Sequence, residues 1–225
     1  MTFWQIVRAS GVIGLLIFLL SVAGLALVIE HALTIRRAIL MPPEFCQQAE
    51  EALRSGQVGR LVQAPECRTS ALGRVLAAGL AELDLGWQAM EKALEEALAE
   101  ESARLYRKVE YLSVIGNLAP MLGLLGTVVG MIVAFRQVAE TQGAARAADL
   151  AEGIYLALVT TVEGLLVAIP ALGAFAFFRN KVDALIAEVA LTTDRLLRPI
   201  KRELLVSVPA PPRAGQASAR VPRGS

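Results

Sequence analysis

The sequence has few of the residues from which reactive sites are built. Its 225 residues include two cysteines, Cys46 and Cys67, and one histidine, His31. Neither cysteine has a Cys or His partner at metal-ligand spacing, so we expect two reduced cytoplasmic thiols and no bound metal or cofactor. The G-x-S-x-G, H-E-x-x-H and Gly-Lys-Ser/Thr motifs are missing from the sequence, which argues against an enzyme. We expect His31 to be a surface anchor at the inner end of an apolar segment.

An excess of charge of one sign is also missing. The 22 basic and 21 acidic residues are interleaved, so the charge pattern gives no reason to expect a nucleic-acid partner. Charged residues are almost absent from three stretches, 11–29, 111–135 and 153–178, the last of which contains only Glu163. Each stretch is long enough to cross the hydrocarbon core, where backbone groups must be satisfied within a helix. We therefore predict an all-α integral membrane protein with three transmembrane helices.

The distribution of lysine and arginine predicts the orientation of these spans. Basic residues flank the large segment between the first two spans and follow the third span, at Arg36, Arg37, Arg104, Arg107, Lys108, Arg179 and Lys181. Because such residues favour the cytoplasmic side, we expect a bacterial inner-membrane protein with its N-terminus in the periplasm and its C-terminus in the cytoplasm. Membrane lipids then surround the spans.

Helix-breaking prolines and glycines, together with the periodicity of apolar residues, predict where each helix begins and ends. We expect one helix from Phe3 to Leu40, ended by Pro42 and Pro43, and short helices up to about Leu85. Two long helices should connect the cytoplasmic bundle with the membrane, from Trp87 through the second span and from about Asp149 to about Leu205. The predicted segments are transmembrane helix 1 with a cytoplasmic extension (1–40), a cytoplasmic helical domain (41–110), transmembrane helix 2 (111–138), a short periplasmic loop (139–151), transmembrane helix 3 (152–178), a cytoplasmic C-terminal helix (179–206) and a disordered tail (207–225), whose last five residues resemble a remnant of a protease-cleavage linker.

Small residues form a stripe along each of the last two spans. Spacings of three and four place them on one helix face, and such stripes let helices approach closely in lipid. We expect them to be buried in helix packing between subunits, with the first span on the lipid side. The predicted packing residues are Gly116, Pro120, Gly123, Gly126 and Gly130 in the second span and Gly153, Gly164 and Pro170 in the third.

Polar residues at membrane depth are the candidates for function. They are Asn117, Thr127, Thr160, Thr161 and Glu163. An acid inside the bilayer costs at least a few kcal/mol, so Glu163 should not face lipid. It can be a structural acid, protonated or hydrogen-bonded to another helix, or it can bind ions or exchange protons. We expect the five residues to line an ion pathway.

Two runs resemble the ExbB/TolQ family. They are Ala119–Ile132 (APMLGLLGTVVGMI), similar to that family's second span, and Gly153–Ala171, similar to its third; Ser70–Leu80 is a weaker match. The resemblance implies a homopentamer whose second and third spans line a pore. An ExbD/TolR-like single-span partner would lie inside the pore, and a TonB- or TolA-like protein would receive the work. The family's two pore threonines fall on Thr127 and Thr161.

The third span departs from the family pattern at its acid. Many members have a glutamate at the position of Leu156, whereas the acid here is Glu163. The two positions share a helix face to within about 20° and are about 10 Å apart along the axis. We favour a stator-type subunit of a motor driven by protons or sodium ions. An oligomeric membrane scaffold that conducts no ions is the alternative, and a flagellar-stator relative of the MotA type fits less well because it has four spans.

Overall fold

A computed structural model of the chain describes residues 11–141 and 147–206, and in these residues the secondary structure is entirely helical. Residues 1–10, residues 142–146 of the expected loop 139–151, and the expected tail 207–225 lie outside the described part. The elements are α2 (Gly11–Thr34), α3 (Arg37–Leu40), α4 (Pro43–Arg54), α5 (Val58–Val62), α6 (Glu66–Thr69), α7 (Ala71–Ala81), the 3₁₀ turn η1 (Leu83–Leu85), α8 (Trp87–Glu140) and α9 (Ala147–Val206). The all-α prediction is confirmed.

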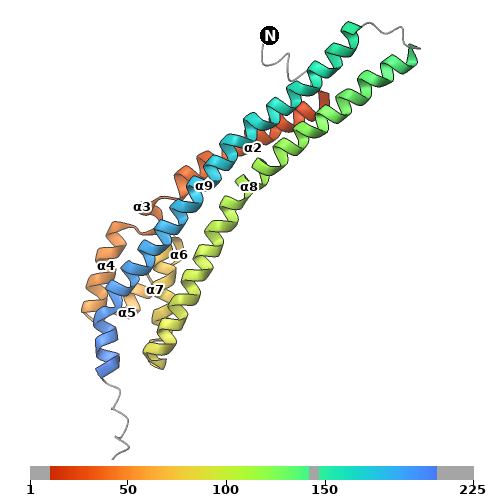
Figure 1. Ribbon diagram of the computed structural model, residues 1–225. Helices are drawn as coiled ribbons and strands as arrows, with labels where there is room; N and C mark the ends of the chain where they lie inside the picture. The colour runs from red at the N-terminus through yellow and green to blue at the C-terminus, as the bar shows by residue number, and fades with distance from the viewer. Residues whose placement is uncertain (1–10, 142–146, 207–225) are drawn as a thin grey trace, which may run out of the picture.

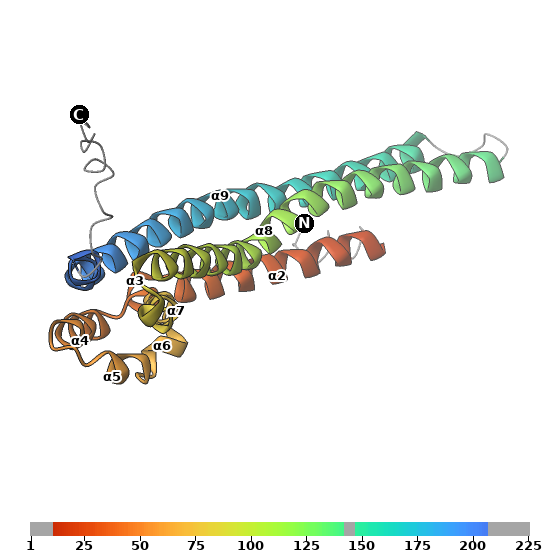
Figure 2. The same ribbon diagram turned by 90° about the horizontal axis from the view of Figure 1, so that it is seen from below.

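Three helices, α2, α8 and α9, are long and apolar enough to cross a membrane. At 1.5 Å per residue, the 54 residues of α8 and the 60 of α9 extend for about 80 and 90 Å, far beyond the roughly 30 Å of a hydrocarbon core. These two helices lie side by side along the molecule, and α2 packs beside them at one end (Figures 1 and 2). The predicted long helices from Trp87 and from about Asp149 are confirmed.

The predicted single helix from Phe3 to Leu40 is wrong at its C-terminal part. Helix α2 ends at Thr34, Arg36 is extended with φ −127° and ψ 146°, and α3 begins at Arg37. Ile35 is only 1% exposed and Leu40 5%, so the break lets the chain bury both side chains in the core beside α4 and α7. No glycine or proline marks this site, because burial of apolar side chains decides it.

Helices α4 to α7 form a compact bundle against the ends of α8 and α9 that lie away from α2 (Figure 2). Its core contains the fully buried side chains of Phe45, Leu72 and Leu76, packed with Met90 of α8 and Leu197 of α9. Burying these apolar side chains is the main favourable term that holds the short helices, which would not be stable alone.

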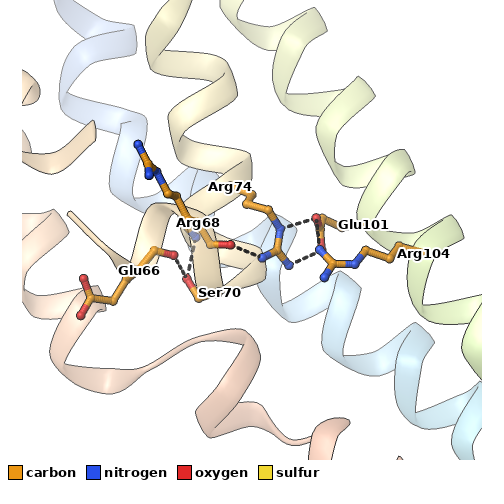
Figure 3. A network of polar contacts seen from close by, with 7 residues as sticks. Glu66, Arg68, Ser70, Arg74, Glu101 and Arg104 are labelled. Carbon is orange, nitrogen blue, oxygen red and sulfur yellow. Dashed lines mark hydrogen bonds and ion pairs between the residues drawn. The ribbon is translucent and has the colours of Figure 1, made fainter. Parts of the chain in front are cut away.

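A buried ion pair attaches α7 to α8 (Figure 3). Arg74 donates through Nε and Nη2 to the two carboxylate oxygens of Glu101, at 2.5 and 2.6 Å, and through Nη1 to the Arg68 carbonyl at 2.9 Å. Glu101 is 6% exposed, and Arg104 lies 3.6 Å from its carboxylate. This bidentate geometry fixes how α7 sits on α8.

Candidate ion pathway at the contact of α8 and α9

Helices α8 and α9 touch along their small residues. A Cβ atom added to Gly126 would lie 2.3 Å from Oγ1 of Thr160, and one added to Gly164 would lie 2.5 Å from the carbonyl oxygen of Ala119. A Cβ atom added to Gly130 would lie 2.9 Å from the Cβ atom of Ala157. The two helices are therefore too close for any side chain at these glycines, and we call this contact the glycine seam.

Within the described part of the chain, the small stripes of α8 and α9 are buried against each other, and their expected burial between subunits stays a prediction. Gly116 lies against Leu172, Gly123 against Thr160 and Thr161, and Gly153 against Ala134, all within the same chain. Close approach through small residues is the known way for helices to associate in lipid, where apolar burial gives no driving force. Pro120 and Pro170 lie inside these helices, which continue through both positions.

Two threonine hydroxyls of α9 point at one carbonyl of α8. Thr160, which is 4% exposed, shares its single hydroxyl proton between the Ala157 carbonyl at 2.7 Å and the more distant Gly123 carbonyl at 3.3 Å. Thr161 donates to the same Gly123 carbonyl at 3.3 Å. The hydroxyls thus satisfy their hydrogen bonds inside the protein, as is required where there is no bulk water.

The polar residues of α8 lie at less buried positions. Thr127, one turn beyond Gly123, is half-buried and donates to the Leu124 carbonyl at 2.7 Å. Asn117 is exposed in the single chain and donates from Nδ2 to the Ser113 carbonyl at 2.8 Å. A side-chain amide on an exposed face of a membrane helix is costly in lipid, which favours a pore or a neighbouring subunit beside Asn117.

Glu163 lies apart from the threonines. It is half-buried and lines a cavity of about 150 Å³ between α2 and α9, together with Gly14, Ile17, Phe18, Ser21, Leu166 and Val167. We expected this acid to face a pore or a subunit boundary, whereas within the chain it faces α2. The five predicted residues therefore form two groups: Thr160, Thr161 and Thr127 near the seam, with Asn117 further along α8, and Glu163 beside the first span.

Sequence reasoning missed the face of α2 that packs on the other two spans. This face repeats at spacings of three and four, and its members are buried or half-buried: Gly14, Ile17, Ser21, Gly24, Val28 and His31. The same spacing rule that found the other two stripes could have found this one, but a serine and two glycines among many leucines and valines give a weak signal.

His31 is not the surface anchor that we expected. It is 3% exposed, its Nε2 lies 2.9 Å from the Lys108 carbonyl of α8, and its ring meets the edge of Phe178 of α9 at a centroid distance of 5.6 Å. The imidazole therefore ties the three long helices together. The position of His31 next to Glu30 suggested the membrane–water interface. His31 lies on the buried face of α2 because it comes seven residues after the buried Gly24.

Comparison with known proteins identifies the family. Residues 68–190, which are more than half of the chain, match the MotA/TolQ/ExbB proton channel family. The chain belongs to this family. The matched region contains the glycine seam, the three threonines and Glu163, whereas the α2 face and His31 lie before it.

Several curated members of the MotA/TolQ/ExbB family resemble the chain. An ExbB homolog of Methanothermobacter thermautotrophicus is 27% identical over 84% of the chain and 67% of its own length. The biopolymer transport protein exbB1 of Vibrio cholerae serotype O1 is 35% identical over 53% of the chain and 54% of its own length. The Tol-Pal system protein TolQ of Pseudomonas aeruginosa is 32% identical over 55% of the chain and 53% of its own length. The alignments with exbB1 and TolQ cover only about half the length of each of these two relatives.

Proposed function

We propose that the chain is a stator-type subunit of an ion-driven motor in the inner membrane. Ions, either protons or sodium, would move down their gradient and drive mechanical work in the periplasm or at the outer membrane. Membership of a proton channel family supports this proposal, as do relatives named for biopolymer transport and for the Tol-Pal system. The N-terminus would then lie in the periplasm and the C-terminus in the cytoplasm.

The observation that carries the proposal is the pair of hydroxyls on the Gly123 carbonyl. Thr160 and Thr161 place two hydrogen-bonding groups at one point of an apolar region, and Thr127 adds a third hydroxyl one turn away. Polar groups inside a membrane are costly and are commonly retained where ions or protons pass. Hydrogen bonds between helices also strengthen their packing, so the experiment below has to separate that use of the hydroxyl from a role in ion passage.

Assembly would complete the pathway. Large apolar side chains stay exposed along α8 and α9 of the single chain, among them Leu124, Val128, Leu158 and Ile169. We propose that these faces are covered in a homopentamer and by an ExbD/TolR-like single-span partner within its pore, with a TonB- or TolA-like protein receiving the work. Native mass spectrometry in mild detergent should show five copies of the chain, and a stable monomer would contradict this arrangement.

The test compares Thr161→Val with Thr161→Ser. The complex is purified from its host through a tag on this chain, so that its membrane partner accompanies it, and is reconstituted into vesicles containing a pH- or sodium-sensitive dye. Valine is nearly isosteric and removes the hydroxyl, so ion flux should fall at least tenfold, whereas serine should keep most of it. Full ion flux in Thr161→Val would show that the Thr161 hydroxyl has no role in ion passage. A wild-type complex without measurable flux would favour the scaffold.

A further inference from the structure

A pocket in the part of the chain expected in the cytoplasm contains two arginines from different helices. It lies between the α3–α4 segment and α9, has a volume of about 430 Å³ and is partly open at the surface. Its polar lining residues are Arg37, Cys46, Gln47, Glu50, Thr192 and Arg195. Two guanidinium groups from segments far apart in the sequence therefore line one open space.

The arginines of the pocket keep donors that no carboxylate uses. Arg37 donates through Nε to Oε1 of Glu188 at 2.6 Å, and its two terminal nitrogens form no hydrogen bond with another described residue. Glu50, the acid that lines the pocket, is paired with Arg54 at 2.6 Å. Arg195 is exposed and forms no ion pair with any residue that the structure describes. Among these five side chains, three are cationic and two are anionic.

The thiol of Cys46 reports that both guanidinium groups are close. Burial raises the pKa of this half-buried thiol above its ordinary value of 9.0, and the positive charges of Arg37 and Arg195 partly offset the rise. Helix α4 begins at Pro43, which also lines the pocket, and its N-cap residue gives no side-chain hydrogen bond. The positive end of the helix dipole thus adds to the field of the two arginines.

A phosphate group suits this arrangement. Guanidinium groups present planar pairs of N–H donors that match phosphate oxygens, and the pocket is larger than one phosphate group, which leaves room for the group that bears it. Arg37 follows the apolar stretch 11–29 by eight residues, or about 12 Å at 1.5 Å per residue. Since lipid headgroups form a layer about 5–8 Å thick on each side of the bilayer, the long Arg37 side chain can meet a lipid phosphate as well as a soluble one.

We propose that Arg37 and Arg195 bind a phosphate group between α3 and α9. The anion relieves the repulsion between the two guanidinium groups and forms charge-assisted hydrogen bonds with both of them. It thereby links α3, which follows the first span, to α9, which contains the third span. The site lies outside the spans, and the motor proposed above does not require it.

Thiol labelling of Cys46 in the full-length protein tests the site. Cys67→Ser keeps a hydroxyl in place of the other thiol and leaves Cys46 as the single cysteine. The protein in dodecyl maltoside is labelled with the anionic sulfonatoethyl methanethiosulfonate and with the cationic trimethylammonioethyl reagent, at constant ionic strength. Arg195→Gln should lower the ratio of the anionic to the cationic rate about threefold, because it removes one charge near the thiol. Arg60→Gln removes an exposed arginine outside the pocket and should leave the ratio unchanged.

Protection by a phosphate then tests binding itself. Millimolar inorganic phosphate, compared with chloride at the same ionic strength, should slow the anionic reagent about twofold or more in the Cys67→Ser protein and not in the Arg195→Gln variant. Arg195→Lys keeps the charge but not the paired donors, so it should keep the rate ratio and lose most of the protection. Protection in phosphatidylglycerol nanodiscs without added phosphate would identify a lipid headgroup as the source, and protection in detergent alone would identify a soluble phosphate.

Three results would overturn the proposal. They are a rate ratio that Arg195→Gln leaves unchanged, protection that is equal with and without Arg195, and the absence of protection both in detergent with phosphate and in the nanodiscs. Each variant is first checked for the wild-type circular dichroism spectrum. Because no ion flux is measured, this test can fail while the motor proposal stands, and the reverse also holds.

Discussion

Replacing Gly164 by alanine should separate α8 from α9. The new Cβ would lie 2.5 Å from the Ala119 carbonyl oxygen and 3.3 Å from Cα of Gly123, both of which are backbone atoms that cannot rotate away. Ordinary contacts begin near 3.4 Å, so the helices must part by about 0.9 Å at this point. A gap of that size removes a quarter to a half of the attraction of each atom pair along the seam.

The expected cost follows from two opposing terms. Overpacking of this kind costs about 1–3 kcal/mol, and alanine recovers about 1 kcal/mol over glycine through its higher helix propensity. We therefore expect Gly164→Ala to destabilise the helix bundle by about 0–2 kcal/mol, which is about 1–3 kcal/mol worse than a glycine-to-alanine replacement without overpacking. Gly173 is the matched control, because it lies on the same helix with nothing within 4 Å of an added Cβ, and Gly173→Ala should be neutral or stabilising by up to about 1 kcal/mol.

The assay is unfolding in mixed micelles with an increasing fraction of sodium dodecyl sulfate, followed by circular dichroism. The two variants differ from the wild type by one methyl group each, so the comparison isolates the site of the methyl group. If Gly164→Ala unfolds at the same detergent fraction as Gly173→Ala, the seam is not a tight contact, and our assignment of the small stripes to packing within one chain is refuted.

Three further predictions concern the part of the chain expected in the cytoplasm and its junction with the membrane. Arg74→Met removes the bidentate partner of the buried Glu101, leaving only the more distant Arg104, and should cost about 2–4 kcal/mol in thermal unfolding, most of which the double variant with Glu101→Leu should restore. His31→Ala removes the contact with the Lys108 carbonyl and should cost about 1–3 kcal/mol, whereas replacement of an exposed polar residue should be neutral. Burial raises the pKa of the Cys67 thiol above its ordinary value of 9.0, so maleimide should label this thiol in the folded protein more slowly than a free thiol at pH 8. The fold favours the neutral thiol, so the stability that this group contributes is lost as the pH rises through and above 9. Labelling at the free-thiol rate would contradict the burial.

Most of the helices could be predicted because their signals are local. The three stretches with at most one charged residue, the absence of proline from Trp87 to Ala119, and the glycines and prolines up to Gly86 are all signals within one segment. The break at Arg36 could not be predicted, since it depends on burying Ile35 in a core built from distant segments. The same holds for the pairing of Arg74 with Glu101, 27 residues later in the chain.

The candidate site could also be predicted from the sequence only in part. Spacing alone placed the small residues of each span on one face, and it identified Thr160, Thr161 and Glu163 as polar groups at membrane depth. Spacing does not state which other helix a face meets, because glycine stripes of one chain and of two chains look alike in a sequence. Only the tertiary structure showed that the stripes of α8 and α9 meet each other, and that His31 is enclosed by three helices.

The sequence by itself determined which three segments are long and apolar enough to cross a membrane, because hydropathy, segment length and the need to satisfy backbone groups in lipid are properties of a single segment. It also determined which side chains are too polar for lipid. The tertiary structure decided which neighbours receive those side chains: the Gly123 carbonyl for Thr160 and Thr161, and the cavity beside α2 for Glu163. The physical reason is that contacts between helices depend on how their faces are rotated and shifted against each other, and these relations arise only when all three spans pack together.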